Sequence, residues 1–556
     1  MLRHFTVLLL LTVTVYGQTS NIVAPNVFTD SDLSNYPKFA TKSYMSTILR
    51  REKPKFELMG PIRLNDYIVA GKLELSLKAF LELTLVNNTD IQIQRLMLET
   101  PKNAITRAFS MFDPQFVARF TSTRTKTLST DALAGASTLS SLSQPLTLNW
   151  QQLAPTGTTY SVGYTATKNS SNSTFANYNP AYGSNINLSF NQPLWRGRDL
   201  GVLRSPITVA KSRLRANEYA FQDQLQQLLT NAENAYWDVV GARENLKVQE
   251  QALALADTSL KRAQRELELG ALPALEIYQP QAVYARSEIL VTQARYRLAQ
   301  TEDALRRQMG IDLDPGLQTM PIVLTESVLP PTDNKPYDKE SIVAEALRVR
   351  PDILNQRQFI DVDEINMKVA SDALRPDFSL FGNYSTQGRG GPFLVRNGTG
   401  NTYIPGGFYD SFEQMWGFGY PVIGGGIQLR LPIKDRNASA NYADAVVSKR
   451  LDQLRVRQAE QNARLDVLNA INQVENSRAS VELAKIAADL AQKRVEADQK
   501  RYDLGTITLF FLLDSQNALT LAQSDLVAQS VQYRRNLLNL YRRGGTLLTE
   551  RGISTN

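Results

Sequence analysis

The sequence has 556 residues, of which 43% are hydrophobic, and its 61 basic and 54 acidic side chains give a net charge of +7. No internal stretch approaches the roughly 18 continuous apolar residues of a membrane-spanning helix, and charges of both signs are interspersed, which argues against a nucleic-acid-binding surface. There is no cysteine, and the one histidine is His4, so thiolate and imidazole chemistry is excluded once a leader is removed. We therefore predict no catalytic residue, no metal site and no cofactor.

Residues 1–17 have the features of a secretory signal peptide. Arg3 precedes an apolar run at 5–15, and Gly17 supplies the small residue before the expected cleavage point. The run is too short to span a bilayer, which favours export. No cysteine follows it, so no lipid anchor is expected there. Residues 18–72 are rich in Pro, Ser and Asn, and we predict an N-terminal extension that is either a disordered leader or a strap along the helices.

Several segments alternate between apolar and polar residues with the period of a β-strand. In "NINLSFNQ" at 185–192, Ile186, Leu188 and Phe190 share one face, and the asparagines and Ser189 share the other. The same pattern recurs at 160–167 and 427–431. A soluble sandwich would need more strands, whereas a transmembrane barrel places lipid on the apolar side and water on the polar side. Because a barrel must close, so few strands per chain predict one shared between copies.

Two further segments lie near these strands. The first half of the chain contains "LTLNW" at 146–150 and "TTYSVGYTATK" at 158–168, which either extend a hairpin or add strands. The glycine-rich stretch 388–426 joins two predicted strands and is expected to be an extracellular loop, since long loops lie on that side of such barrels. It lacks the lysine and strand-to-helix context of a nucleotide-binding loop.

Two exceptionally long helices are predicted. Residues 438–504 contain no glycine or proline, and residues 207–269 contain only Gly241, so each run would extend roughly 95–100 Å. Apolar residues are sparse, as at Leu465, Leu468, Val474, Val481 and Leu490. This pattern predicts burial along a narrow seam, as in a coiled coil or a hollow ring of helices. The returning helices are expected at 281–309 and 506–543.

Each long run ends at a glycine. Gly270 and Gly505 stand where the chain turns back into the returning helix, and glycine accepts the positive φ of a tight reversal without steric cost. An ordinary helix stop is the alternative, which the matching second glycine makes less favourable.

The chain is a tandem duplication. Four pairs of segments resemble each other: 86–98 with 349–360, 112–120 with 374–384, 188–199 with 427–437, and 265–282 with 500–518. The interval from Asp90 to Asp352 equals the interval from Pro114 to Pro376. We predict a first repeat at 73–310, a linker at 311–340, a second repeat at 341–543 and a tail at 544–556, each repeat ordered as helix, strands, long helix, turn and returning helix.

Together these residues resemble the TolC family of outer-membrane efflux proteins, from about residue 73 onward. The motifs are the duplicated helix starts, the strand ends at Pro193 and Pro432, and "RYDLGTITLFFLLDSQNAL" at 501–519. Asp352 after Pro351 keeps the helix-start pattern, whereas Thr89 stands where proline is usual. The resemblance implies an α+β membrane protein, a homotrimer whose chains share one outer-membrane β-barrel continuous with a long periplasmic α-helical barrel.

The function implied is that of a passive exit duct in a tripartite efflux or type I secretion system. The expected partners are a periplasmic adaptor protein, an inner-membrane pump and outer-membrane lipid, with no nucleic acid. Because the sequence has no nucleotide site, work must come from the pump. Drugs, metal ions, proteins and polysaccharides all remain candidate cargoes.

The resemblance also implies roles for residues near the two turns. The adaptor would meet the helix tips, namely Leu269, Gly270, Ala271, Leu504, Gly505 and Thr506. Asp514 matches a pore-facing carboxylate, so three copies would form an acidic ring. Tyr502 and Glu276 match positions that hydrogen-bond across helices to hold the entrance shut, although both also fit routine interhelical contacts. Ile507 and Phe511 replace a family arginine and a family pore carboxylate, so packing of Phe510 and Phe511 is expected to help close the constriction.

Two other classes fit less of the sequence. A periplasmic coiled-coil scaffold or adaptor without a pore would explain the long helices but not the alternating strands. A carboxylate-dependent cell-wall enzyme would lack any compact catalytic domain. The duct is the interpretation that uses both the helices and the strands.

Overall fold

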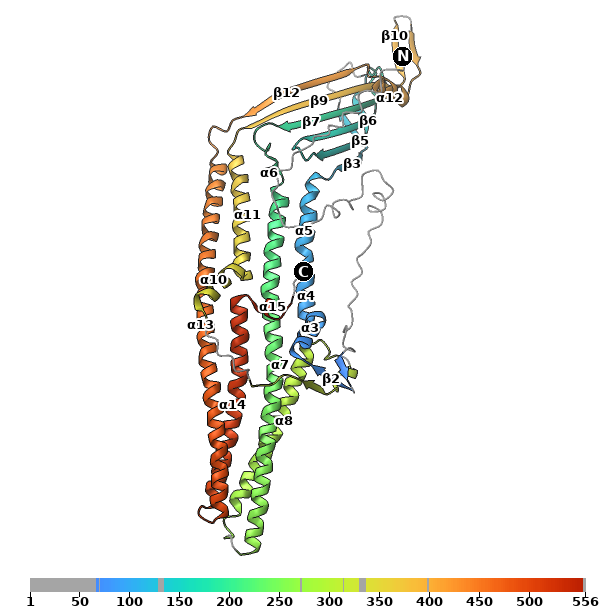
Figure 1. Ribbon diagram of the computed structural model, residues 1–556. Coiled ribbons are helices and arrows are strands. Elements are labelled where there is room, and N and C mark those ends of the chain that lie inside the picture. Colours follow the sequence, from blue (N-terminus) through green and yellow to red (C-terminus); the bar gives the residue numbers. More distant parts are fainter. Residues whose placement is uncertain are drawn as a thin grey trace. The chain divides into compact units, whose positions relative to one another are not determined.

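The computed structural model describes residues 67–553, except 70, 129–134, 271–272, 314, 330–336 and 398–399. The chain divides into two units, 1–60 and 61–556, and every described residue belongs to the second. The predicted signal peptide and most of the predicted extension therefore lie outside the described residues. In the second unit, most of the strands gather at one end of a set of long helices, whereas β2 (Lys72–Leu75) lies beside the middle of those helices (Figure 1).

The main sheet contains seven strands in the order β12-β9-β7-β6-β5-β3, with β4 also beside β5. Their bounds are β3 (Gln115–Phe120), β4 (Thr123–Leu128), β5 (Thr138–Leu153), β6 (Thr159–Ser171), β7 (Ala181–Pro193), β9 (Asp377–Gly390) and β12 (Pro421–Arg430). Every pairing is antiparallel. The segments 146–150 and 158–168 thus belong to two added strands, β5 and β6.

The strands β3 and β4 form one row of the sheet. Gln115 pairs with Gln151 and Thr123 pairs with Ser143, so both strands keep a single register along β5. They are separated opposite Pro145, which has no N–H to donate to the ladder. The sheet therefore has six strand rows, all antiparallel.

The stretch 388–426 is more ordered than the loop predicted for it. Besides the ends of β9 and β12, it contains β10 (Phe393–Asn397), β11 (Gly400–Ile404) and helix α12 (Phe408–Trp416). The prediction was wrong because glycines at 388 and 390 looked like loop residues. In the structure both remain in β9, where their lack of a Cβ admits the backbone of α12.

The predicted long helices are confirmed as α7 (Ser205–Glu268) and α13 (Arg436–Asp503), and the returning helices as α8 (Tyr278–Gln308) and α14 (Leu509–Gly544). Gly241 does not interrupt α7; a Cβ there would lie 2.8 Å from Val531 Cγ2, so the glycine permits close packing of α7 on α14. No helix in the described part of the chain is both long enough and apolar enough to cross a membrane.

The seam predicted for α13 is only partly buried within one chain. Val474 and Val481 are buried and Leu468 packs beside them, whereas Leu465 and Leu490 are each 59% exposed. Buried alanines, among them Ala463 and Ala470, bring α13 close to its neighbours instead. The two exposed leucines lie outside the seam that α13 forms with α14.

Shorter elements complete the two halves. They are β1 (Ile68–Val69), β2 (Lys72–Leu75), α3 (Leu77–Asn87), α4 (Thr89–Met97), α5 (Glu99–Phe109), η2 (Ser110–Phe112), α6 (Leu200–Leu203), α9 (Pro315–Gln318), β8 (Ile322–Leu324), α10 (Lys339–Val349), α11 (Pro351–Ala373) and α15 (Leu547–Glu550). β8 lies in the predicted linker and pairs in parallel with β2. The linker thus adds a strand to a small sheet in the order β1-β2-β8.

The largest hydrophobic cluster surrounds the middle of α7. Tyr236 is fully buried, packs 5.5 Å from Phe80 between ring centroids, and donates a hydrogen bond to the Leu75 carbonyl at 3.3 Å. Beside it, the buried carboxylate of Glu233 accepts hydrogen bonds from Arg551 at 2.5 and 3.0 Å. The residue near the C-terminus thus neutralises a charge in the centre of the helical region.

Two pairs of helices meet end to end beside the long helices. In the first half, the Asn88 amide caps α4 and also donates to the Gln308 carbonyl at the end of α8, at 2.9 Å. The chain leaves α8 through Gly310, whose φ is +65°; a Cβ there would lie 2.5 Å from the Asn87 carbonyl oxygen. This junction therefore consists of neutral groups and requires glycine.

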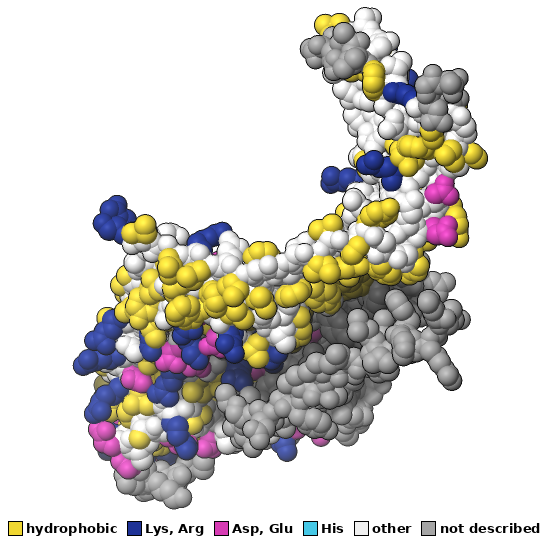
Figure 2. Space-filling view, turned by 90° about the horizontal axis from the view of Figure 1, so that it is seen from above, with side chains coloured by type: hydrophobic (Ala, Val, Ile, Leu, Met, Phe, Trp, Pro, Cys, Tyr) yellow, Lys and Arg dark blue, Asp and Glu magenta, His cyan; other side chains and the backbone are white. Residues whose placement is uncertain are grey.

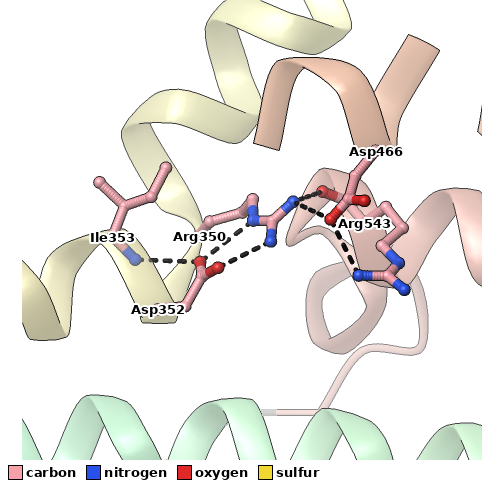
Figure 3. Close-up of polar contacts among 5 residues, drawn as sticks. All are labelled: Arg350, Asp352, Ile353, Asp466 and Arg543. Atoms are coloured by element: carbon pink, nitrogen blue, oxygen red, sulfur yellow. Dashed lines mark hydrogen bonds and ion pairs between the residues drawn. The ribbon is translucent and has the colours of Figure 1, made fainter. Parts of the chain in front are cut away.

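The corresponding junction in the second half is ionic (Figure 3). Arg350 precedes α11 and binds Asp352 through two nitrogens, at 3.0 and 2.7 Å, while reaching the Arg543 carbonyl of α14 at 3.4 Å. Asp466 of α13 accepts from Arg350 at 3.5 Å and from Arg543 at 2.9 Å. Burial acts to lower the pKa of Arg350, and its bonds to Asp352 and Asp466 outweigh burial and raise it. Three helices are thereby joined at one guanidinium.

We expect Arg350→Met to destabilise the helical region by about 1–3 kcal/mol, because it leaves Asp352 and Asp466 without their shared cation. The matched control is Arg357→Met. Arg357 pairs with Glu460 at 3.0 Å between the same helices, α11 and α13, but is 45% exposed at the side chain. An exposed pair should cost no more than about 0.5 kcal/mol. Chemical unfolding followed by helical circular dichroism measures the free energy of unfolding of both variants. Equal losses of stability would contradict the role of Arg350 in joining the three helices.

Candidate functional site

The sheet has one continuous apolar face. A single line of paired residues crosses all six strand rows and is apolar or aromatic throughout: Phe116, Trp150, Val162, Leu188, Tyr384 and Ile423. Phe116 and Ile423, at the two ends of this line, are 62% and 79% exposed. Figure 2 shows hydrophobic side chains gathered in a band along the sheet. Ile186 and Phe190 lie on the same face as Leu188, as the alternation predicts.

The opposite face is polar. The neighbouring line of pairs contains Asn149, Gly163, Asn187 and Ser385 in its four central rows, with Val117 and Val422 at its two ends. Ser161 in β6 and Ser189 in β7 lie on the same face, two residues from Gly163 and Asn187, and share a hydrogen bond of 2.7 Å. The sheet therefore presents a water-compatible surface on one side and an apolar surface on the other.

The strands are long enough for a bilayer. β5 has 16 residues and β12 has 10, and a tilted transmembrane strand needs about 9–11. Exposed aromatic and aliphatic side chains over this length are costly in water but suited to hydrocarbon.

The tips of the long helices are open turns. Gly270 and Gly505 have φ values of +72° and +71°, and a Cβ at either position would meet nothing within 4 Å. Leu269 and Leu504 stand just before them and are 83% and 78% exposed. Thr506 bonds back to the Arg501 carbonyl at 2.9 Å. Ala271 lies outside the described residues. Both tips thus present a glycine turn with an exposed leucine.

A polar cluster above the tips joins α7 to α13. Tyr502 donates to Glu266 at 2.6 Å, and the Arg262 guanidinium lies 4.6 Å from the centroid of the Tyr502 ring. Arg262 also binds Glu266 at 2.9 Å and forms an ion pair with Asp503. Burial, followed by the hydrogen bond to Glu266, raises the pKa of Tyr502 to about 12. The tyrosine therefore remains a neutral donor at physiological pH.

Within the chain, the partner of Tyr502 is Glu266 rather than Glu276. Glu276 is exposed, and its backbone N–H donates to the Pro273 carbonyl at 3.0 Å. Neither Arg262 nor Glu266 was predicted from the sequence. Their spacing of four residues on α7, close to the turn glycine, was the available signal.

Asp514 has a cationic partner that the sequence did not reveal. Arg494 of α13 lies 3.4 Å from its carboxylate, and both side chains are 55% exposed. Arg494 also approaches Asp498 at 3.5 Å. Phe510 and Phe511 are 56% and 53% exposed, with ring centroids 5.6 Å apart. The aromatic pair and the carboxylate are thus accessible on the surface of a single chain.

No metal site accompanies these groups: across the described ranges, no three or more His, Cys, Asp or Glu side chains come together in a way that could hold an ion.

Comparisons with known proteins agree on one family. The model of the family described as "Outer membrane efflux protein" matches residues 157–311 and 342–546, so the match begins later than residue 73. The outer membrane protein TolC of Vibrio cholerae is 22% identical over 344 residues, covering 61% of this chain and 73% of that protein. The pyoverdine export outer membrane protein OpmQ of Pseudomonas aeruginosa is 22% identical over 371 residues, covering 65% and 69%.

Solved structures share the fold. A membrane protein from Pseudomonas aeruginosa has a TM-score of 0.61 and 18% identity, covering 88% of this chain and 99% of that chain. The CmeC outer membrane channel of Campylobacter jejuni has a TM-score of 0.59 and 16% identity, covering 91% and 94%.

The two faces of β7 lead to opposite expectations for neighbouring residues. Leu188→Arg should disfavour membrane insertion by roughly 2–4 kcal/mol if the apolar face meets the bilayer midplane, because a charge would enter hydrocarbon. Asn187→Arg is the matched control and should be mild, since it faces the polar side. The fraction of protein inserted into lipid vesicles measures both variants. Equal effects at the two positions would argue against a barrel wall.

Proposed function

Because this chain belongs to the outer membrane efflux protein family, we infer that it is the outer-membrane channel of a tripartite efflux system, with its helices in the periplasm. The observation that supports this function most strongly is the apolar line across all six strand rows, from Phe116 to Ile423. A periplasmic scaffold without a pore has no use for such a surface.

Three chains would close the barrel. The six rows are all antiparallel and even in number, so the edge strand β12 runs opposite to the edge row β3–β4. Copies related by a threefold axis can therefore pair β12 of one chain with β3–β4 of the next and keep an antiparallel sheet. The result would have eighteen strands, a size that leaves an aqueous channel. The polar face of each sheet would line it.

The helices would continue this channel into the periplasm as a hollow barrel. The exposed leucines of α13 would meet neighbouring chains there, and the helix tips would meet a periplasmic adaptor that connects to an inner-membrane pump. The channel would be a passive conduit without catalytic residues, so transport energy would come from the pump.

Purification in detergent tests the assembly directly. We expect heat-modifiable trimers in the outer-membrane fraction that form ion-conducting pores in planar bilayers. A soluble monomer without pore activity would overturn the channel and favour the scaffold.

Bulky substitutions at the tips should block docking without blocking assembly. We expect Gly505→Trp and Gly270→Trp to abolish export while trimers remain in the membrane, because the tips are open but must approach the adaptor closely. Gly71→Trp is the matched control: its φ is +76°, and a Cβ there also meets nothing within 4 Å, so its local strain is comparable. Normal export by Gly505→Trp, measured with the cognate pump, would refute docking at the tips.

The ion pair at the entrance gives two variants with opposite expected effects. Three copies of Asp514 would form an acidic ring that concentrates cations. Asp514→Ala should therefore lower the cation selectivity of single channels. Arg494→Ala should raise it, because Arg494 lies 3.4 Å from that carboxylate and partly neutralises it.

Selectivity follows from reversal potentials under a salt gradient across a planar bilayer. A selectivity unchanged in both variants would make Asp514 a surface carboxylate outside the pore. In the same recordings, Tyr502→Phe and Glu276→Gln should raise conductance if these residues help to close the entrance.

A further inference from the structure

Helix α12 lies on the apolar face of the sheet. Its Ser411 hydroxyl is 2.9 Å from Ser184 of β7, and the Thr386 hydroxyl of β9 donates to the Met415 carbonyl at 3.2 Å. Ser184 is two residues from Ile186, and Thr386 pairs with Ile186, so all three point to the same side. Two polar side chains on this face, Ser184 and Thr386, thus find their hydrogen-bond partners in α12.

Two glycines let the helix backbone touch the strand. A Cβ on Gly388 would lie 1.9 Å from the Ser411 carbonyl oxygen, and a Cβ on Gly390 would lie 2.2 Å from the Gly407 carbonyl oxygen. Such approaches are possible only without a side chain. The helix is therefore seated on the apolar face of the sheet, and its place there is fixed by backbone contact.

One flank of α12 is an aromatic ladder. Phe408, Phe412 and Trp416 follow each other at intervals of four residues, with ring centroids 6.5 and 6.1 Å apart, the second pair stacked. The ladder rests on the sheet through Tyr182 beside Phe408 at 6.3 Å and Tyr164 beside Phe412 at 6.5 Å. It thereby extends the apolar face of the strands along the helix.

Much of this aromatic surface has no cover within the described residues. Ser411 and Met415 face the sheet and are fully buried, whereas Tyr409 is 72% and Trp416 61% exposed. Asp410 and Gln414 project from the opposite flank. Asp410 accepts from the Gly407 N–H at 2.7 Å, and Gln414 accepts from the Arg389 N–H at 3.2 Å. The two flanks of α12 thus differ: one is aromatic and the other is polar.

We propose that α12 is an interfacial helix that lies along the wall in the outer leaflet of the membrane, with its aromatic flank in contact with lipid near the boundary between headgroups and acyl chains. This rests on the proposed function, because it requires the apolar face to meet lipid. Three observations select lipid as the occupant. The aromatic flank is continuous with the apolar strands, tyrosine and tryptophan favour this boundary, and α12 lies at the end of the sheet remote from the long helices (Figure 1).

The absence of cysteine from the sequence allows a direct test by spin labelling. Single-cysteine variants Trp416→Cys, Gln414→Cys and Leu188→Cys carry a nitroxide in trimers reconstituted into phosphatidylcholine vesicles. Collisions with oxygen, which concentrates in lipid, are compared with collisions with a water-soluble nickel complex. We expect the labels at 416 and 188 to favour oxygen and the label at 414, on the other flank of α12, to favour nickel.

Each other outcome has a distinct meaning. If the label at 188 favours oxygen but the label at 416 favours nickel, α12 lies in water and the inference fails while the channel stands. A label at 416 that neither reagent reaches means that protein covers α12, which also overturns the inference. A label at 188 that favours nickel overturns the barrel wall, and the interfacial helix with it.

A second pair of variants tests the seating of the helix. Gly388→Ala in the Trp416→Cys background should reduce the preference of the label for oxygen, because the new Cβ displaces α12 from the wall. Gly419→Ala is the control, since a Cβ there meets nothing within 4 Å, and it should leave the preference unchanged. An unchanged preference in Gly388→Ala would contradict the backbone seating that fixes α12 in the interface.

Discussion

Backbone hydrogen bonding is the constraint on which this architecture depends, because hydrocarbon offers no partner to an N–H or C=O group. Among the described residues, the sheet ends at β12 on one side and at the β3–β4 row on the other. No further strand in the described part of the chain satisfies these edges. Assembly, insertion and pore formation are therefore coupled in the proposed trimer, since all three require the same pairing between chains.

In the proposed trimer the helical region meets a different constraint, which is to hold a wall one helix thick. Small buried residues such as Ala263, Ala463 and Ala470 let helices of one chain approach closely. The two end-to-end junctions then divide the wall into an upper and a lower tier. One junction is made by a neutral amide at Asn88 and the other by the guanidinium of Arg350, so two helix junctions of one chain are held by different chemistry.

Much of the fold could be predicted from local patterns, and most of what could not be predicted depends on contacts between distant segments. The long helices followed from the lack of breakers, and the turns at Gly270 and Gly505 from the need for positive φ. Helix α12 was missed because Gly388 resembles a loop residue until the helix it contacts is known. The partner of Tyr502 depends on how α7 is rotated against α13, and Arg350 meets Asp466 only after three helices have packed. These are properties of packing, which no single segment encodes.

The added hairpin of β5 and β6 has an evolutionary consequence. A single inserted strand would make the two edges of the chain parallel to each other and would prevent antiparallel closure around a threefold axis. Insertions must therefore arrive as complete hairpins, and each one adds two strands to every copy. The circumference of such a pore can change only in large steps, so gradual selection on what passes through it must act on side chains and loops instead.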